Sequence, residues 1–397
     1  MIKYPKGFKA CGFHCGIKRV KDDLTVIVSD VPASAAAVYT TNLFQAAPLQ
    51  VTKAHIDKEG MAQAIVINSG VANAAMGKQG LADAEAVAQT LAATFAIPDH
   101  YTIVASTGVI GMPLPVEKIN TGIEKAKSVL APLEESAEAA SRGIMTTDTV
   151  PKTAALTVEL DGTEVHFWGM CKGAGMIHPN MSTMLGFVLC DAAIDSKLLH
   201  QALTDAIGDS FNMISVDGDT STNDMVTVLA NGQAGNAFIQ EASSEAYAHF
   251  ASALKDICID LAKQIVADGE GATCLFEVKV VQAPTTNDAK IIARAVTSSS
   301  LVKAAMYGRD ANWGRIACAA GYSGALFNPD KMDIFIGDLQ VAANGQGLAF
   351  DEDLAFDILS KKSVDVLIDL HEGNGEAVAW GCDLTHVYVS INADYRS

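Results

Sequence analysis

The stretch from residue 183 to residue 189, Thr-Met-Leu-Gly-Phe-Val-Leu, is almost wholly apolar. A strand with one face in water alternates polar and apolar side chains, whereas a strand buried on both faces reads as an unbroken apolar run. We therefore expect residues 183–189 to form a buried strand in a sheet that is covered on both sides. Gly175, Pro179 and Asn180 interrupt the uncharged segment before it, so that segment reads as a turn and is too short to span a membrane.

Other elements follow from periodicity. Short apolar runs predict strands at residues 24–28, 64–67, 101–105 and 276–281. Apolar residues recur at helical spacing over residues 84–95, before Pro98, and again over residues 252–266. The mixed order of strands and helices predicts an α/β or α+β class.

A polar turn at residues 282–287 marks a candidate domain boundary, which divides the chain into a main domain, 1–282, and a smaller C-terminal domain, 283–397. Within the second part, residues 364–370 and 377–380 flank the turn Glu372-Gly373-Asn374-Gly375 and predict a hairpin. Residues 387–391 alternate in hydrophobicity and predict a strand that holds the end of the chain in place.

The composition limits the class of protein. Hydrophobic residues make up 49% and charged residues 19%, a globular balance, and the formal net charge of -18 argues against binding to nucleic acid or anionic membranes. The first residues lack the apolar core of a signal peptide, so we expect a cytoplasmic protein. The eight cysteines are scattered without a CxxC pair, which favours buried thiols over a metal site at Cys11, His14 and Cys15.

Common catalytic signatures are absent from the sequence: it has no G-x-S-x-G elbow, no H-E-x-x-H and no P-loop. What remains is a glycine-rich turn and a proline that deliver Ser182-Thr183 to the start of the buried strand. A threonine that becomes the first residue of a chain carries its own base, the α-amine, with a pKa of about 7.7–8.0. Packing and capping are the ordinary roles of such a Ser-Thr pair, so both interpretations stay open on this evidence.

Ten blocks of sequence resemble one family, in the family's order and up to both ends of the chain. The family is that of the ornithine acetyltransferases, the bifunctional glutamate N-acetyltransferases of arginine biosynthesis (the ArgJ family). The blocks are Gly16-Ile17-Lys18, Asn68-Ser69-Gly70, Ser106 to Gly111, Met145 to Thr149, Lys172 to Gly186, Asp217 to Asp224, Asp268 to Thr273, Asp310 to Arg315, Ala379 to Leu384 and Ile391 to Tyr395.

The resemblance implies a fold and a reaction. It implies an N-terminal-nucleophile-like α/β fold of stacked β-sheets flanked by helices, with a smaller C-terminal domain. It implies an acetyltransferase that cleaves its own chain between Ser182 and Thr183 and moves acetyl from N2-acetyl-L-ornithine to L-glutamate by a ping-pong mechanism. Acetyl-CoA is a second donor in bifunctional members. The resemblance implies no metal or prosthetic group, and a heterotetramer with two copies of each cleaved fragment.

The resemblance also implies roles for individual residues. Thr183 matches the nucleophile, and Thr107 and Gly108 match the oxyanion hole. The positions that match substrate-binding residues are Thr146, Lys172, Thr183, Glu270, Asn392 and Ser397. Lys172 and Glu270 supply one charge of each sign, as an amino-acid substrate requires.

Each role has a plainer alternative. Lys172 could be solvated, Glu270 could be a turn carboxylate between two glycines, and Thr146 could bond locally beside Thr147. Many relatives have alanine where this chain has Ser182, so the bond before Ser182 is an alternative cleavage point. The rival functions are a self-processing aminopeptidase or amidase of the same superfamily and an uncleaved, catalytically silent binding protein.

Overall fold

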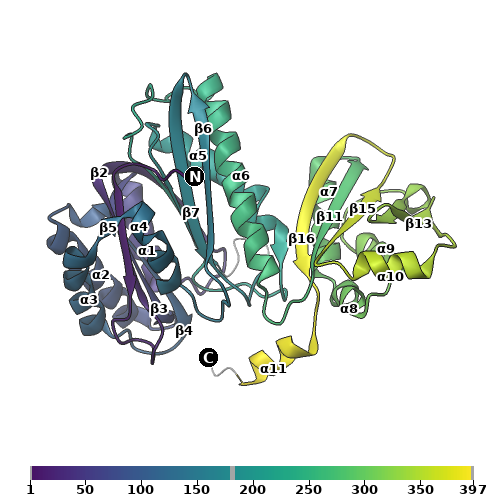
Figure 1. Ribbon diagram of the computed structural model, residues 1–397, viewed down its shortest axis with the longest axis horizontal. Coiled ribbons are helices and arrows are strands. Elements are labelled where there is room, and N and C mark those ends of the chain that lie inside the picture. Colours follow the sequence, from purple (N-terminus) through teal and green to yellow (C-terminus); the bar gives the residue numbers. More distant parts are fainter. Residues whose placement is uncertain (1, 179–183, 395–397) are drawn as a thin grey trace.

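The computed structural model describes residues 2–178 and 184–394. Within them the chain forms two β-sheets in two lobes that lie side by side, each with helices packed against its sheet (Figure 1). The first lobe carries the strands up to β8 together with β10, and the second carries β9 and the strands from β11 onward. The predicted α/β class of sheets flanked by helices is confirmed.

The first sheet is built around the long strand β2. Its path runs β4-β3-β2-β10-β8-β7-β6, and β1 pairs with β2 and with β5. The strands are β1 (Phe8–Phe13), β2 (Leu24–Tyr39), β3 (Met61–Val71), β4 (Thr102–Val109), β5 (Ala131–Pro132), β6 (Lys152–Leu160), β7 (Thr163–Lys172), β8 (Leu185–Cys190) and β10 (Met225–Ala230). Strand β8 pairs antiparallel with β7 and parallel with β10, so it lies inside the sheet.

Strand β8 is buried on both faces, as its apolar sequence predicts. Phe187 and Leu189 pack into one core cluster, whereas Val188 and Cys190 pack into another on the opposite face. Strand β3 shows the same alternation, because Ile65 belongs to a different cluster from its neighbour Val66. Side chains that alternate along a strand point to opposite faces, so helices must cover both sides of this sheet.

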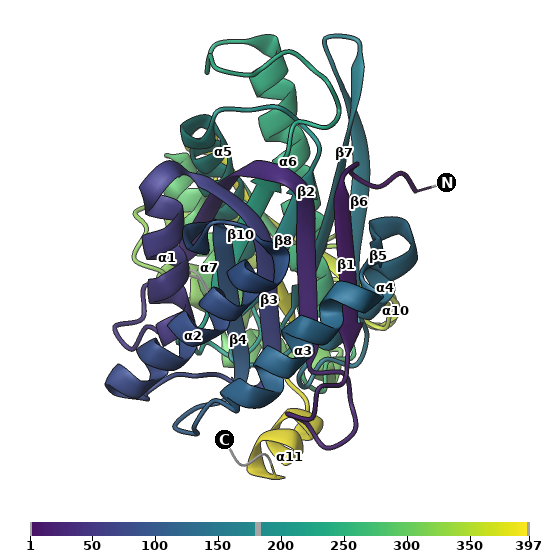
Figure 2. The same ribbon diagram turned by 90° about the vertical axis from the view of Figure 1, so that its left-hand side faces the viewer.

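Six helices belong to the first lobe: α1 (Ala47–Glu59), α2 (Gly77–Phe95), α3 (Val116–Val129), α4 (Leu133–Gly143), α5 (Ser196–Gly208) and α6 (Glu245–Ala267), with 3₁₀ turns η1 (Asp99–Tyr101) and η2 (Phe211–Met213). Figure 2 shows α2 and α3 in front of β3 and β4. Helix α6 begins earlier than its apolar periodicity predicts, because the Ser244 hydroxyl accepts a hydrogen bond from the Tyr247 amide at 3.1 Å and caps it.

The second sheet has the order β14-β13-β12-β15-β11-β16-β9. Its strands are β9 (Ile214–Ser215), β11 (Leu275–Ala283), β12 (Asp333–Ile336), β13 (Leu339–Ala343), β14 (Gln346–Gly347), β15 (Ser363–Asp369) and β16 (Gly375–Cys382). The helices after β11 are α7 (Thr286–Ser298), α8 (Ser300–Gly308), α9 (Trp313–Gly321), the 3₁₀ turn η3 (Pro329–Lys331), α10 (Glu352–Leu359) and α11 (His386–Asp394).

The predicted hairpin over residues 364–380 is wrong, although both of its strands exist. Strands β15 and β16 do not pair with each other, because β11 lies between them, parallel to β15 and antiparallel to β16. The connection crosses the end of β11, where the amides of Glu372 and Gly373 both donate to the Gln282 carbonyl at 2.9 Å. A local pattern of two strands and a turn cannot reveal a third strand inserted from elsewhere in the chain.

The predicted strand over residues 387–391 is also wrong: these residues belong to helix α11. Alternating apolar residues form a strand only where a sheet edge is available to pair with them, and α11 buries none of its described side chains. The helix is held through polar contacts with the first lobe instead, as described below for the site.

The division of the chain into 1–282 and 283–397 stays a prediction. Strands β9 and β11 of the second sheet both begin before residue 283. One continuous apolar cluster also joins the lobes, since it contains Phe250 of α6, Phe276 of β11 and Ile292 of α7. No helix in the described part of the chain is long and apolar enough to cross a membrane.

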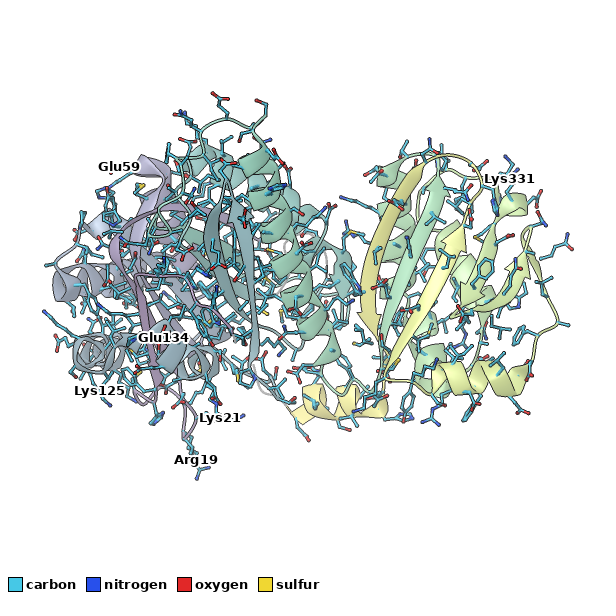
Figure 3. The ribbon with its side chains drawn as sticks, turned by 45° about the horizontal axis from the view of Figure 1, so that its top comes forward. Arg19, Lys21, Glu59, Lys125, Glu134 and Lys331 are labelled. Carbon is cyan, nitrogen blue, oxygen red and sulfur yellow. The ribbon has the colours of Figure 1, made fainter. Side chains whose placement is uncertain are left out.

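Charged side chains separate into two groups. Most lysines, arginines and carboxylates point outward, as Arg19, Lys21, Glu59, Lys125, Glu134 and Lys331 do in Figure 3. Lys152 is different, since only 1% of its side chain is exposed, and its Nζ donates to Asp148 and to Asp268 at 2.6 Å each. Burial alone would lower the pKa of Lys152, but the two carboxylates raise it above its ordinary value.

Asp148 is the matching buried anion. Its Oδ1 accepts from Lys152 and from the Gly173 amide, and its Oδ2 accepts from the Thr146 amide at 2.9 Å. Burial alone would raise the pKa of Asp148, but the charges of Lys172 and Lys152 hold it below its ordinary value. A buried carboxylate with this many donors ties together strands and loops that are distant in sequence.

We predict that Asp148→Asn lowers the free energy of unfolding by about 3 kcal/mol at pH 7, because it leaves Lys152 with one carboxylate instead of two. Since the pKa of Asp148 is depressed by folding, its contribution is complete above the unfolded pKa and is lost as the pH falls below about 4. Urea unfolding at pH 7 and at pH 3.5 should show the gap to wild type narrowing in acid.

The matched control is Asp30→Asn, which breaks the exposed ion pair with Lys9. That variant should change the unfolding free energy by less than about 1 kcal/mol. Equal losses for both variants, or a gap that stays constant with pH, would show that Asp148 contributes no more than a surface charge.

Candidate active site

Lys172 and Thr107 come from strands at different positions in the first sheet and meet in the structure. The Lys172 Nζ donates to the Thr107 Oγ1 at 3.3 Å, and the two residues are only 5% and 8% exposed. The solvated alternative for Lys172 is therefore excluded. Burial lowers the pKa of Lys172, and the nearby carboxylates of Asp148, Asp224 and Glu270 oppose that shift only in part.

Lys172 also lies beside the segment that leads out of the predicted cleavage point. It is the last residue of β7 and pairs in register with Leu185, the first residue of β8. Ser182 and Thr183 themselves, like Ser397, lie outside the described residues, so their predicted roles stay predictions. The backbone of Lys172 is thus paired with the first residue of the strand that follows Thr183.

Gly108 allows a close approach between two strands. Strands β3 and β4 run parallel, with Ser69 opposite Thr107 and Gly70 opposite Gly108. Gly108 has a φ of +132°, and a Cβ there would lie 2.3 Å from the Gly70 carbonyl carbon, so no other residue fits without moving the backbone. The sequence predicts a strand over residues 101–105, but β4 continues to Val109, so Thr107 and Gly108 lie within the strand near its end.

Thr146 is brought to the site by Asp148. The Asp148 carboxylate accepts from the Thr146 amide at 2.9 Å and from the Gly173 amide at 2.7 Å, so it joins the Thr146 loop to the residue after Lys172. Thr146 itself is half-buried. Asp148 lies in one of the blocks that resemble the family, but sequence reasoning assigned it no role, because only the structure shows which two segments it connects.

Glu270 and Asn392, two further residues predicted for the site, contact each other. The Asn392 Nδ2 donates to the Glu270 Oε2 at 2.8 Å, which links helix α11 to the loop after α6. The Glu270 carboxylate packs on Gly175, where a Cβ would lie 2.5 Å from the Glu270 Cδ. The predicted grouping of Glu270 and Asn392 is therefore present, although the helix that carries Asn392 was predicted as a strand.

Asp217 binds the glycine-rich turn and helix α11 at once. Its two carboxylate oxygens accept from the amides of Met176 and Ile177 at 2.6 and 2.9 Å, and its Oδ2 also accepts from the Tyr388 hydroxyl at 3.0 Å. The block from Asp217 to Asp224, one of those that resemble the family, thus begins beside the glycine-rich turn. Met176 and Ile177 precede the predicted cleavage point in the sequence. Asp217 therefore holds the backbone of the segment that leads toward it.

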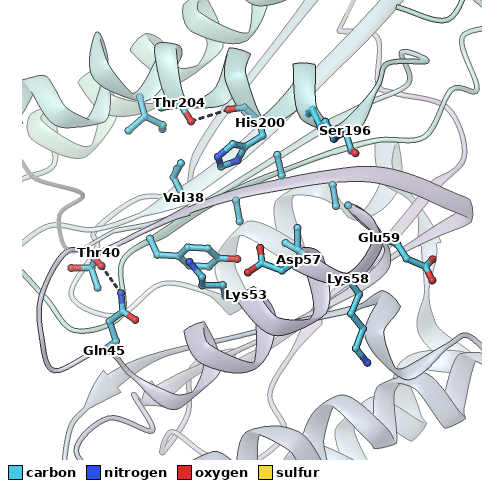
Figure 4. A pocket seen from close by; sticks show the side chains of 18 of the residues that line it. Val38, Thr40, Gln45, Lys53, Asp57, Lys58, Glu59, Ser196, His200 and Thr204 are labelled. Atoms are coloured by element: carbon cyan, nitrogen blue, oxygen red, sulfur yellow. Dashed lines mark hydrogen bonds between the residues drawn. The ribbon is translucent and has the colours of Figure 1, made fainter. Parts of the chain in front are cut away.

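A groove with a volume of about 830 Å³ lies apart from these residues, between β2, α1 and α5 (Figure 4). Its lining includes Lys53, Asp57 and His200, but none of the predicted site residues. One of its lining residues, Thr40, donates its amide to the Asp224 carbonyl at 2.9 Å. Cavity size alone would therefore direct attention away from the cluster around Lys172.

No group of three or more His, Cys, Asp or Glu side chains suited to a metal ion occurs among residues 2–178 and 184–394. The eight cysteines are free thiols, and seven of them are buried or half-buried, with Cys318 exposed. The arrangement around Lys172 instead offers a cation, a hydroxyl and a carboxylate within one cluster, which suits an acyl-transfer reaction on a charged substrate.

The chain is similar over its whole length to proteins of one family. The ArgJ family matches residues 9–397. The "Arginine biosynthesis bifunctional protein ArgJ" of Symbiobacterium thermophilum is 52% identical over 399 residues, which cover 100% of this chain and 98% of that protein. The protein of the same name from Thermotoga neapolitana is 49% identical over 398 residues, covering 99% of each chain.

A solved structure agrees with these matches. The crystal structure of arginine biosynthesis bifunctional protein ArgJ from Bacillus halodurans aligns with a TM-score of 0.52 at 48% identity, and it covers 54% of this chain and 100% of that chain. A family match over nearly the full length, with relatives at about half identity, leaves no other family to consider. This chain is an enzyme that belongs to the ArgJ family.

Proposed function

We propose that this protein transfers the acetyl group of N2-acetyl-L-ornithine to L-glutamate and releases L-ornithine and N-acetyl-L-glutamate. One observation carries the proposal: Lys172, Thr107 and Glu270 come together near the start of β8, two residues after Thr183. An amino-acid substrate carries a carboxylate and an amino group, and Lys172 and Glu270 match that pair of charges. The names of the curated relatives place them in arginine biosynthesis, in agreement with these substrates.

The proposed first step is self-cleavage. The Thr183 hydroxyl attacks the Ser182 carbonyl carbon, the peptide C–N bond breaks, and the Thr183 nitrogen takes up the hydroxyl proton. Water then hydrolyses the resulting ester, which leaves a carboxylate on Ser182 and a free amine and hydroxyl on Thr183. The hydrogen bonds of Asp217 to Met176 and Ile177 support this step, since they hold the chain that leads into the scissile bond.

The extent of the crystallised relative supports a cleaved chain. The whole Bacillus halodurans chain matches only 54% of this one. A fragment beginning at Thr183 would contain 215 residues (397 − 182), which is also 54% of this chain. A separate polypeptide of that size is what cleavage before Thr183 produces.

In the transfer reaction, the Thr183 hydroxyl attacks the acetyl carbon of acetylornithine while the α-amine takes its proton. Thr107 and Gly108 stabilise the negative charge on the acetyl oxygen, and ornithine leaves with the proton. The glutamate amine then attacks the acetyl-threonine ester, and the Thr183 hydroxyl is restored. Lys172, in contact with the Thr107 hydroxyl, adds a positive charge beside the developing oxyanion.

Two further features complete the proposal. Because the curated relatives are named bifunctional, we propose acetyl-CoA as a second acetyl donor, with no metal or prosthetic group. We also propose a cytoplasmic enzyme that assembles from two copies of each fragment. The net charge of -18 suits a protein that stays dissolved at high concentration.

We predict two fragments on a denaturing gel, of 182 and 215 residues (397 − 182), with the second beginning Thr-Met-Leu-Gly. Thr183→Ala should give one intact and inactive chain, since it lacks the hydroxyl that attacks. The control Ser182→Ala should still be cleaved, because alanine is equally small. N-terminal sequencing decides the matter: a second fragment that begins at Ser182 would move the nucleophile to that residue.

We predict a covalent acetyl intermediate. Incubation with acetylornithine alone should add one acetyl group to the fragment that begins at Thr183, and initial rates should give parallel lines when both substrates are varied. Activity should decline in acid, as the α-amine with an ordinary pKa of about 7.7–8.0 becomes protonated. Intersecting lines without an acetylated fragment would contradict the mechanism, and acetyl release to water in preference to glutamate would identify an amidase.

We predict that Asn392→Ala, or deletion of Ser397, lowers kcat/KM for acetylornithine by about tenfold and leaves the fragment pattern unchanged. The physical reason is that Asn392 fixes the Glu270 carboxylate through the 2.8 Å hydrogen bond. The matched control is Val389→Ala on the same helix, whose side chain is 65% exposed. Wild-type efficiency in both test variants would reduce the end of the chain to a structural role.

A further inference from the structure

Asn223 and Asp224 are consecutive residues with contacts that the proposed reaction does not yet use. They lie between β9 and β10, directly before the first residue of β10, and are 6% and 1% exposed. Strand β10 lies between β8 and β2, with Met225 opposite both Leu185 and Tyr39. The pair is therefore attached to the centre of the first sheet, where the backbone is held from both sides.

Asp224 binds the peptide group that follows the proposed nucleophile. Its Oδ1 accepts a hydrogen bond from the Met184 amide at 2.9 Å. Met184 directly follows Thr183 in the sequence, and its nitrogen belongs to the planar peptide unit that joins the two residues. The Met184 carbonyl is held as well, since it accepts from the Met225 amide at 3.1 Å.

Asn223 binds the peptide group that precedes the proposed oxyanion hole. Its Nδ2 donates to the Ser106 carbonyl at 2.8 Å and to the Ala72 carbonyl at 2.7 Å. The Ser106 carbonyl belongs to the same planar peptide unit as the Thr107 nitrogen. The hydrogen bond to Ser106 therefore orients the peptide group between Ser106 and Thr107. Together, the two hydrogen bonds of Asn223 connect β4 to the residue that follows β3.

Burying the second carboxylate oxygen of Asp224 costs free energy. The Oδ2 is buried and has no hydrogen-bond partner among the residues that the structure describes. Burial raises the pKa of Asp224 well above its ordinary value, although the Met184 amide, the charge of Lys172 and the hydroxyls of Thr40 and Ser221 act against the shift. Burying this carboxyl group therefore costs free energy that its contacts offset only in part.

We infer that Asn223 and Asp224 form a positioning clamp, in which Asp224 holds the peptide after Thr183 and Asn223 holds the peptide before Thr107. Because the two residues are adjacent in the chain, they set the spacing between the nucleophile and the groups that stabilise the oxyanion. This spacing matters in both self-cleavage and acetyl transfer, since a small displacement of reacting groups lowers the rate strongly. The inference rests on the proposed function.

The Asp224 half of the clamp is tested by the rate of self-cleavage. Asp224→Ala removes the acceptor for the Met184 amide and should slow cleavage at least about tenfold. Asp224→Asn keeps a carbonyl oxygen at the same place and should stay within about threefold of wild type, because positioning needs an acceptor and not a charge. Cleavage is followed on denaturing gels after synthesis in a cell-free system, and thermal unfolding is measured for each chain.

The Asn223 half is tested by steady-state kinetics of the cleaved enzyme. Asn223→Ala should lower kcat at least about tenfold and change the KM for acetylornithine little, because the clamp acts on the transition state and not on substrate binding. Asn223→Ser is the milder second variant, to be used if the alanine variant does not fold. Thr227→Val on β10 is the matched control, since Thr227 is fully buried and its hydroxyl also has no described partner.

The outcomes separate the clamp from the proposed function. Wild-type cleavage in Asp224→Ala, equal slowing in Asp224→Asn and Asp224→Ala, or a kcat for Asn223→Ala no lower than that for Thr227→Val would each overturn the clamp. In all three cases the wild-type enzyme still cleaves itself and transfers acetyl. A wild-type chain that gives one band and no transfer would instead overturn the proposed function, and the clamp with it.

Discussion

The buried carboxylate of Asp148 is the contact on which the site depends most. It accepts from Lys152, from the Thr146 amide and from the Gly173 amide, and Lys152 continues the network to Asp268 at the end of α6. Isolated buried charges are expensive, so a network of this kind persists only when every member has partners in good geometry. One anion thus holds together the Thr146 loop, the end of β7 and the end of α6.

Around this network the site is assembled from parts that are far apart in sequence. Thr107 lies near the end of β4, an edge strand of the first sheet, Lys172 is the last residue of β7, and Glu270 follows α6. Helix α11 then returns from the second lobe and reaches Glu270 and Asp217 through Asn392 and Tyr388. The second lobe therefore contributes to the first through hydrogen bonds of its last helix as well as through the shared apolar core.

The two errors of sequence interpretation have the same origin. Residues 364–380 have the pattern of a hairpin, but β11 is inserted between β15 and β16. Residues 387–391 read as a strand, but they belong to helix α11 and are in neither of the two described sheets. In both segments the order of apolar and polar residues alone led to the wrong strand pairing. Strand pairing is a contact between distant segments, and periodicity within one segment carries no information about it.

The sequence by itself determined the family, the α/β class and the doubly buried strand after Thr183, and it named Thr107, Thr146, Lys172, Glu270 and Asn392 as candidates for the site. These follow from residue types in order along the chain, which is what apolar runs and matched blocks record. Only the tertiary structure decided that Lys172 is buried against Thr107, that Asp148 joins two loops, and that Asn223 and Asp224 link β8 to the end of β4. Burial and the pKa changes that it causes depend on what surrounds a side chain in space. In this site the surrounding residues come from segments more than a hundred residues apart in the sequence.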